Sequence, residues 1–398
     1  MRKIWLLMLG AFTLGLDAYV MAGLLPSVAD DLGTTVSLAG QMVTVFTLAY
    51  AVSAPLVAGL MSGVRPRALL IAALAVFALG NALTALAPNV GVLLGARVVA
   101  GAGAGVYSAL STATAAALAP GERRGRALAL VMGGMSTGTV LGVPLGVLLA
   151  EQTGWRATMW VVTGLGLVAL VGLAAGLPEV PADPPVPARA RLAAVTDRAV
   201  LPIVGVSFLG AVASLGLYTY LAPVLAASGG VSEHGVAPYL WAWGIGGVLG
   251  SVLAGPLVDR TGKVLTLVTA LLVVLVVSEG SLPLLGAAAF PALVVWGAAG
   301  WAFQVPQQHR LLALRAERGT VALALNNSAL YLGSAVGSGA AGLALSAGLA
   351  PERLPWAAAA VAGAGLVLHL AVAVRRSRRD GRCRDAAGVS TLGTYEHS

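Results

Sequence analysis

Residues 4–26 read IWLLMLGAFTLGLDAYVMAGLLP, an apolar run whose only charged side chain is that of Asp17. A helix of about 20 mostly apolar residues is long enough to cross the hydrocarbon core of a bilayer. Eleven similar runs follow, and the chain of 398 residues is 58% hydrophobic but only 10% charged. Soluble domains carry about 25% charged residues. The sequence therefore predicts an all-α polytopic membrane protein.

The twelve expected spanning helices form two sets of six. The first set comprises residues 4–26, 39–61, 67–87, 92–118, 127–150 and 157–176. The second set comprises residues 200–226, 236–258, 264–281, 284–304, 321–347 and 355–374. Because the ninth and tenth runs are separated by a very short turn, we expect Glu279 to be a loop acid at the outer end of the ninth helix. His309 is expected in the loop at the inner end of the tenth.

The placement of the basic residues predicts the orientation of the chain. If all twelve runs cross the membrane, 21 of the 24 Lys and Arg side chains fall on the side of the N-terminus. The other three, Arg97, Arg156 and Arg353, fall on or near the opposite side. Cytoplasmic segments of membrane proteins are enriched in Lys and Arg. We therefore expect both termini in the cytoplasm.

A linker rich in proline separates two halves of the chain, and a basic tail follows the second half. We expect a first six-helix bundle over residues 1–176, a cytoplasmic linker over 177–199, a second bundle over 200–374 and a basic tail over 375–398. The halves share motifs: Gly138-x-x-x-Gly142 matches Gly333-x-x-x-Gly337 at an offset of 195 residues. Two such bundles around a central cavity are typical of transporters in which one half rocks against the other.

Two charged side chains inside expected spans are candidates for function. Asp17 lies near the middle of the first span, and Arg97 lies about 8 Å inside the outer end of the fourth. A charge at membrane depth costs several kcal/mol unless it is paired or reaches water. Asp17 is therefore a proton carrier, part of a fixed structural pair with Arg97, or a static part of the cavity lining. Arg97 is either functional or an interfacial anchor.

Glycine motifs mark two further regions. Gly138, Gly142 and Gly146 recur at four-residue spacing in the fifth span, which allows close helix packing, and Pro144 removes one backbone hydrogen bond and bends the helix. A loop motif after the eighth span contains Gly255, Asp259, Arg260, Gly262 and Lys263. Its copy after the second span contains Gly59, Arg65 and Arg67 but has Gly63 in the place of the acid. The alternative interpretation of both loops is an ordinary polar turn.

These motifs resemble those of the major facilitator superfamily, and in particular its drug:proton antiporter branch of twelve helices. Val143 separates Gly142 from Pro144, as in the chloramphenicol-resistance and sugar-efflux exporters of bacteria, which the chain resembles over its whole length. The resemblance implies proton coupling through Asp17 and Arg97, an antiporter motif in the fifth helix, and loops that gate the inner face. The resemblance does not include the acidic residue of the loop motif in the first half, because Gly63 stands in its place. It therefore implies no closure of the inner face by an acid of this loop.

Polar and aromatic side chains within the spans are candidates for lining a substrate cavity. The set comprises Tyr19, Tyr218, Tyr220, Trp243, Asn326, Asn327 and Tyr331. Aromatic side chains also gather at membrane interfaces, so each of them is equally compatible with an anchoring role. The cavity has fewer amides and charges than a sugar site requires, which favours a drug-like compound.

Other function classes fit the sequence less well. The chain has no GxxxxGK[ST] loop for an ATP-driven pump, and no cluster of His, Cys or acids for an enzyme or a metal site. A basic face for nucleic acid is absent, and the arginines at 375–384 instead suit anionic lipid. We expect a monomer of the bacterial cytoplasmic membrane that exports a small drug-like compound, needs no cofactor and is driven by the proton gradient. Efflux of a sugar or nucleoside is the alternative.

Overall fold

The computed structural model describes residues 3–60, 64–119, 124–179, 197–229, 231, 235–285, 288–314 and 319–392. The described part of the chain is helical and contains no strand. The first half contains α1 (Ile4–Asp31), α2 (Val36–Leu60), α3 (Pro66–Ala85), α4 (Val90–Leu118), α5 (Arg124–Thr137), η2 (Gly138–Gly142), α6 (Val143–Thr153) and α7 (Trp155–Gly176). The second half contains α9 (Val200–Thr219), α10 (Leu221–Gly229), α11 (Ala237–Thr261), α12 (Val264–Leu285), α13 (Phe290–Ala302), α14 (Gln304–Leu314), α15 (Gly319–Ser346), η5 (Pro351–Arg353) and α16 (Leu354–Leu392).

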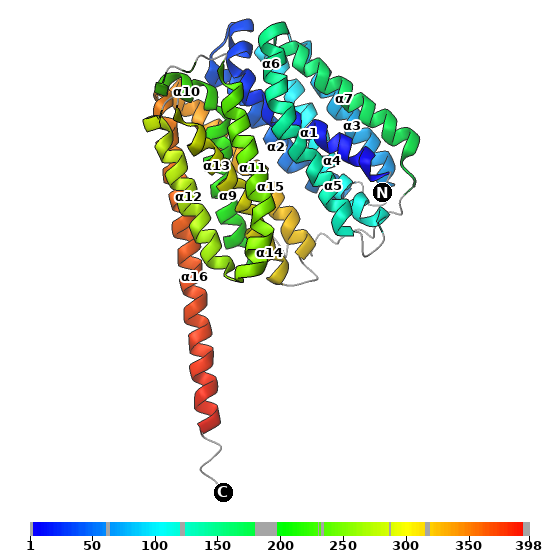
Figure 1. Cartoon of the computed structure of the whole chain (residues 1–398). Coiled ribbons are helices and arrows are strands. Elements are labelled where there is room, and N and C mark those ends of the chain that lie inside the picture. The colour runs from blue at the N-terminus through cyan, green and yellow to red at the C-terminus, as the bar shows by residue number, and fades with distance from the viewer. Residues whose placement is uncertain are drawn as a thin grey trace.

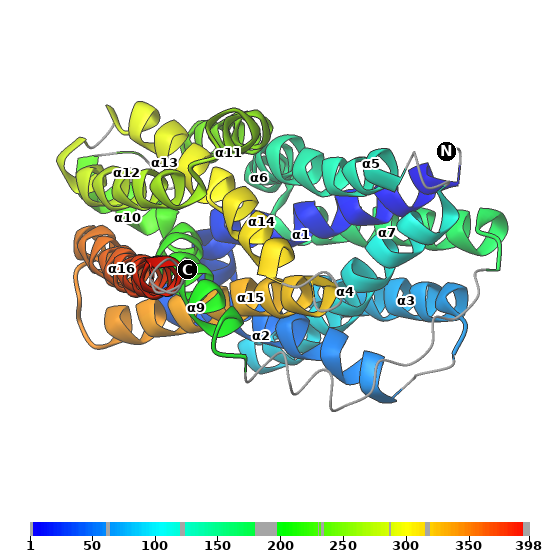
Figure 2. The same ribbon diagram turned by 90° about the horizontal axis from the view of Figure 1, so that it is seen from below.

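The helices form the two expected bundles, α1–α7 and α9–α16, which lie on opposite sides of the molecule (Figures 1 and 2). Within the first bundle, α1 packs against α2, α4, α5 and α7, so the first apolar run forms a central helix of that bundle. The most extensive contact between the bundles joins α2 to α15. Most of the expected linker, residues 180–196, lies outside the described residues.

Three of the twelve spans are interrupted helices: the fifth, which is divided into α5, η2 and α6, the seventh and the tenth. The seventh breaks at Tyr220, where Pro223 has no N–H to donate to the carbonyl of Thr219, and continues as α10. The tenth breaks at Phe303, between α13 and α14, where Pro306 leaves the carbonyl of Ala302 without its helical donor. By length and composition, eleven of the described helical segments suffice to cross a membrane, and the interrupted tenth is the span missing from that set.

Two expectations about single residues are wrong. Glu279 is not a loop acid, because α12 continues through it to Leu285 and buries it completely. His309 is not in a loop but within α14. In both places the predicted end of the helix was placed at a proline or at a cluster of polar residues. The helix continues through these residues instead.

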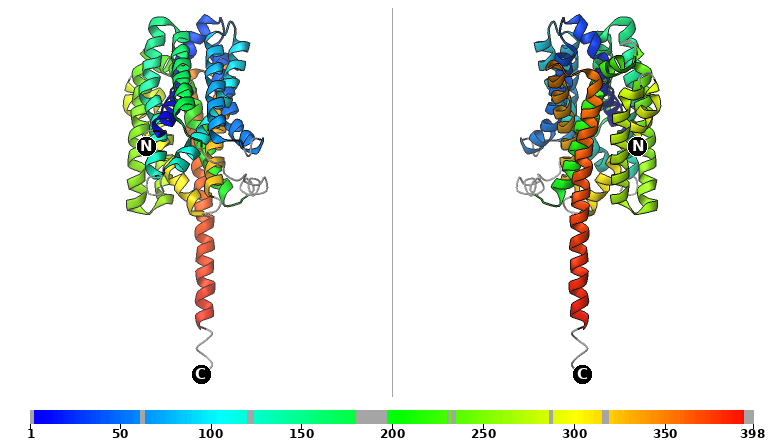
Figure 3. Two further views of the ribbon diagram at one scale, coloured as in Figure 1. Left: turned by 90° about the vertical axis from the view of Figure 1, so that its right-hand side faces the viewer. Right: turned by 90° about the vertical axis from the view of Figure 1, so that its left-hand side faces the viewer.

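The last helix, α16, is longer than the expected twelfth span. The expected tail begins at residue 375, and α16 runs on to Leu392. This part of α16 projects well beyond the two bundles (Figure 3). The N-terminal end of α1 and the projecting end of α16 both lie toward the lower side of the view in Figure 1.

Candidate functional site

A buried ion pair joins α1 to α4. Arg97 donates from Nη1 to Oδ1 of Asp17 at 2.8 Å, and both side chains are almost completely excluded from solvent. Asp17 lies halfway along α1, so the pair lies near the middle of the first bundle. The sequence named both residues, and the structure brings them together. An ion pair at this depth satisfies the condition under which charges are tolerated in a membrane.

Two neighbours hold the pair in place. Asn81 of α3 accepts a hydrogen bond from Nη1 of Arg97 at 3.2 Å and directs its amide nitrogen toward Oδ2 of Asp17 at 3.4 Å. The guanidinium carbon of Arg97 lies 4.1 Å from the ring centroid of Phe46 on α2. Four helices of one bundle thus converge on a single ion pair. Phe46 was not identified from the sequence, because a phenylalanine in an apolar span gives no signal of its own.

The antiporter motif packs against the helix that carries Asp17. A Cβ atom added to Gly138 would lie 2.0 Å from the carbonyl oxygen of Phe12, so α1 and η2 touch through their backbones. The N–H of Val143 donates to the carbonyl of Gly138, five residues back, as in a π-helix. This π-helical turn ends at Gly142, and Pro144, which lacks a backbone donor, lies in the first turn of α6. Gly142 and Gly146 continue the contact along α1 at Leu16 and Val20.

The same contact recurs in the second half. Gly333 and Gly337 of α15 approach the carbonyl oxygens of Phe208 and Val212 on α9. These positions are displaced by 195 or 196 residues from Gly138, Gly142, Phe12 and Leu16. The internal repeat predicted from the glycine spacing is therefore a repeat of helix packing. The second half lacks the π-helical turn, because α15 has no proline in the position of Pro144.

An aromatic cluster occupies the interface between the bundles. We call Tyr19, Tyr218, Trp243 and Trp301 the interface aromatic cluster. The ring of Tyr19 from α1 lies 5.7 Å from that of Tyr218 on α9 and 5.9 Å from that of Trp243 on α11. The indole Nε1 of Trp243 is buried and finds no hydrogen-bond acceptor within the described part. The cluster therefore offers π-faces and an available donor, as a site for a flat, partly apolar molecule would.

The remaining cavity candidates on α15 differ in their surroundings. Tyr331 stacks on Tyr50 of α2, with 3.6 Å between ring centroids, and so joins the bundles. Asn326 is buried beside Gln304, and its Oδ1 accepts no hydrogen bond from the described residues. Asn327 is exposed one helical turn before Tyr331. Tyr50 was not singled out from the sequence, although its pairing with Tyr331 puts it at the interface.

Tyr220 does not belong to the aromatic cluster. Its hydroxyl donates to the carbonyl oxygen of Ser37, at the beginning of α2. Nearby, Ser37 donates to the carbonyl of Gly342, and the hydroxyls of Thr44 and Ser338 are 2.9 Å apart. We call these five residues the polar seal. It joins the bundles at the end where α2 begins and α15 ends.

The two loop motifs lie at the opposite end, and their described residues form no ion pair between the bundles. Gly262 has a φ of 60°, a left-handed conformation that favours glycine, and ends α11 with a hydrogen bond to Val258. Asp259, Arg260 and Lys263 are exposed and form no ion pair with a described residue, and Gly255 lies one turn earlier in α11.

The copy of this motif after α2 is described only in part. Gly59 lies in the last turn of α2, whereas Gly63 lies outside the described residues. Arg67 donates to the carbonyl of Ala174 at 2.6 Å and lies 3.5 Å from Glu179. The more exposed Arg65 lies 3.9 Å from Glu179. Both arginines therefore fasten α3 to the end of α7 within one bundle.

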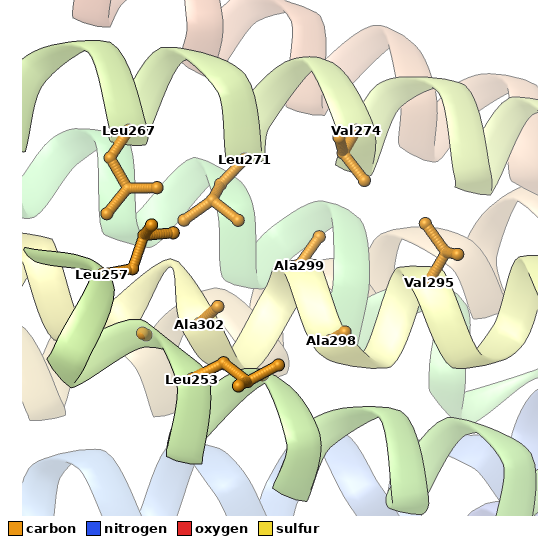
Figure 4. Close-up of a pocket in the computed structure, with 11 residues that line it drawn as sticks. Leu253, Leu257, Leu267, Leu271, Val274, Val295, Ala298, Ala299 and Ala302 are labelled. Atoms are coloured by element: carbon orange, nitrogen blue, oxygen red, sulfur yellow. The ribbon is translucent and has the colours of Figure 1, made fainter. Parts of the chain in front are cut away.

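A groove on the outer side of the second bundle is entirely apolar. It measures about 240 Å³ and lies among α11, α12 and α13, where carbon side chains such as Leu253, Leu271 and Val295 line it (Figure 4). Leu253 is 64% exposed on this surface. Because no polar group points into the groove, it suits lipid chains and cannot orient a substrate.

Comparison with known proteins identifies the family. The Major Facilitator Superfamily model matches residues 7–338. The inner membrane transport protein YdhP of Escherichia coli is 33% identical over 365 residues, covering 91% of this chain and 93% of that protein. A chloramphenicol resistance protein of Streptomyces lividans is 33% identical over 339 residues, covering 84% and 86%.

A solved structure shares the fold. The D-xylose-proton symporter superposes with a TM-score of 0.75 at 18% identity, covering 92% of this chain and 96% of that one. The family model and the relatives span both bundles, the ion pair and the glycine motif. This chain is a membrane-spanning transporter that belongs to the Major Facilitator Superfamily.

Proposed function

We propose that the protein exports a small, partly apolar drug-like compound from a bacterial cell in exchange for protons. The observation that carries this proposal is the buried pair of Asp17 and Arg97, because Asp17 lies on α1 and the opposite face of that helix bears Tyr19. The pair supplies a protonatable group inside the membrane, and the interface aromatic cluster supplies a site for an apolar molecule. The chloramphenicol resistance relative supports the drug class.

The basic residues support an orientation with both termini in the cytoplasm, since 21 of 24 lie on that side of twelve spans. The polar seal then closes the outer end of the interface, and the loop motif that contains Asp259 lies at the inner end. The conformation described above is thus closed to the outside. We take residues 1–176 and 200–374 as the two rocking bodies of a monomer, with the linker 177–199 and the tail 375–398 on the inner side.

The proposed exchange begins with a proton that enters from outside and binds the carboxylate of Asp17. Protonation removes the attraction between Asp17 and Arg97, which keeps its contacts with Asn81 and Phe46. Because α1 also carries Tyr19, a movement of α1 changes the aromatic cluster at the same time. Proton and substrate then need not occupy one cavity, because Asp17 lies inside the first bundle and the cluster lies at the interface.

The second candidate substrate is a sugar or a nucleoside. The observations in its favour are the amides of Asn326 and Asn327 on the turn beside Tyr331 and the fold shared with a D-xylose-proton symporter. Sugars need several convergent hydrogen-bonding groups. The described interface offers more aromatic surface than amides, so the drug-like class is the better candidate.

The test is drug susceptibility of a bacterium that lacks its own efflux pumps and expresses this chain. Chloramphenicol heads a panel of varied compounds, and an uncoupler is the control for the proton gradient. Resistance to one or a few compounds that the uncoupler abolishes is the expected result. If the protein is fully expressed in the membrane but protects against no compound, the drug class is excluded. Transport of radiolabelled sugars and nucleosides is then the next measurement.

A further inference from the structure

Glu279 is a second buried carboxyl, and it belongs to the other bundle. It lies in α12, which contains no other charged residue. Its side chain is completely buried. Neither of its oxygens accepts a hydrogen bond of normal geometry from a described residue. Asp17, by contrast, is paired with a guanidinium. Burial without a partner strongly disfavours the ionised form of a carboxyl.

The described helices packed against α12 form no ion pair with Glu279. The described residues of α10 and α13 include no titratable side chain, and α9 and α11 contribute the phenols of Tyr218 and Tyr239 to their bundle. His369 of α16 bonds to the carbonyl of Leu265, which lies about 21 Å from Glu279 along α12 at 1.5 Å per residue. His309 and Arg310 of α14 lie toward the same end, since Arg310 contacts His369. The charges of Asp259 and Arg260 lie in the last turn of α11.

One polar neighbour connects Glu279 with the aromatic cluster. The indole of Trp296 lies beside the carboxyl, but it donates its N–H to the hydroxyl of Ser214 at 2.6 Å. The ring of Trp296 packs edge to face against Trp243, with 6.0 Å between centroids. Trp243 in turn contacts Tyr19 and Tyr218. A change at Glu279 therefore reaches the cluster through two packed indoles.

We propose that Glu279 is a proton-binding site of the second bundle and carries a proton in this conformation. The proton occupies one carboxyl oxygen while Trp296 donates to Ser214. When the proton leaves to water, the carboxylate becomes the stronger acceptor and takes the indole N–H from Ser214. The resulting shift of Trp296 changes its contact with Trp243. This proposal deepens the proposed proton coupling and rests on it for its role in transport, but the protonation itself is measurable without any substrate.

The direct test is infrared spectroscopy of the purified full-length protein at neutral pH. The carbonyl-stretch band of a protonated carboxylic acid is expected in the wild type and in Asp17→Asn, and it is expected to be lost in Glu279→Gln. Glu151→Gln, which changes an exposed acid of α6, is the matched control and should keep the band. A band that survives Glu279→Gln, or a wild type without such a band, would overturn the proposal.

A second variant covers the case in which Glu279→Gln fails to fold. Trp296→Phe keeps most of the ring packing but removes the N–H that would stabilise the carboxylate. We expect the acid band of Trp296→Phe to persist to higher pH than in the wild type, by about one pH unit for the loss of one hydrogen bond to a charged group. An identical titration in both proteins would contradict the coupling. If the band behaves as expected but no compound is exported, the proposed function fails and this site stands.

Discussion

Asp17 and Tyr19 are two residues apart on α1 but belong to different parts of the molecule. Successive residues of an α-helix are about 100° apart, so these two side chains point in nearly opposite directions. Asp17 faces Arg97 and Asn81 inside the first bundle, whereas Tyr19 faces Tyr218 and Trp243 of the second. A single helix thus connects a protonatable pair with the interface between the bundles. This arrangement makes α1 the element through which the two sites influence each other.

The first prediction concerns the ion pair. Asp17→Asn leaves the guanidinium of Arg97 buried without a counter-charge, which should lower the free energy of unfolding by about 3 kcal/mol. Gradient-driven export should be lost, because the amide cannot exchange a proton, while binding of the substrate is partly retained. Thermal unfolding in detergent and uncoupler-sensitive efflux measure the two effects separately.

A compensating variant separates the roles of stability and coupling. Asp17→Asn combined with Arg97→Gln removes both charges, so stability should recover while export stays absent. Asp31→Asn is the matched control: it changes the last acid of the same helix, whose ion pair with Arg156 is partly exposed to solvent. Normal export by Asp17→Asn would show that the pair is only structural.

The second prediction concerns the backbone contact between α1 and η2. Gly138→Ala introduces a Cβ 2.0 Å from the carbonyl oxygen of Phe12, so the helices must separate. We expect a loss of about 1–3 kcal/mol in the free energy of unfolding and a marked loss of transport. Gly133→Ala is the matched control, because the added Cβ at Gly133 meets no atom within 4 Å. Equal behaviour of the two variants would show that close packing at Gly138 is unnecessary.

The sequence predicted the fold because membrane spans depend on apolar length, which can be read directly. It also predicted the pairing of Asp17 with Arg97 as one of two interpretations, because two opposite charges in neighbouring spans need each other. The repeat of Gly138 and Gly333 predicted the packing symmetry of the halves. These predictions rest on local composition and spacing, and they survive errors of a few residues in helix boundaries.

What escaped prediction depends on helix rotation and on three-dimensional neighbours. Glu279 was assigned to a loop because Pro283 follows it, yet α12 accommodates that proline within its last turn. Tyr220 was grouped with the cavity residues, but the break between α9 and α10 directs it to the polar seal. Ser37 and Thr44 gave no signal at all, since serine and threonine are common in membrane helices. Only the pairing of α2 with α15 gives them a role.

The third prediction tests the polar seal. The hydroxyls of Thr44 and Ser338 are 2.9 Å apart, so cysteines at both positions lie within the range of a disulfide. In a background with Cys383→Ser, the double variant Thr44→Cys and Ser338→Cys should crosslink on mild oxidation and lose transport. Reduction should restore transport. Electrophoretic mobility after cleavage in the linker measures the crosslink, since the two cysteines lie in different halves.

The controls for the seal are the two single cysteine variants under the same oxidation. Neither should change mobility or transport. If the oxidised double variant transports at the normal rate, the bundles do not separate at this end and the rocking mechanism is wrong. If no crosslink forms, the closed end of the resting protein is not the one joined by α2 and α15.

The fourth prediction tests the aromatic cluster with two tryptophans of one helix. Trp243 of α11 is 1% exposed and contacts Tyr19 and Tyr218, whereas Trp241 is 37% exposed on the outer surface of the same helix. Trp243→Ala should weaken substrate binding by about 2 kcal/mol, roughly thirtyfold in Kd, because a central aromatic anchor is lost. Trp241→Ala should leave Kd unchanged. Equilibrium binding of the compound found in the susceptibility screen gives both values. Similar losses in the two variants would mean that the effect comes from stability of α11, and an unchanged Kd in Trp243→Ala would place the substrate away from the cluster.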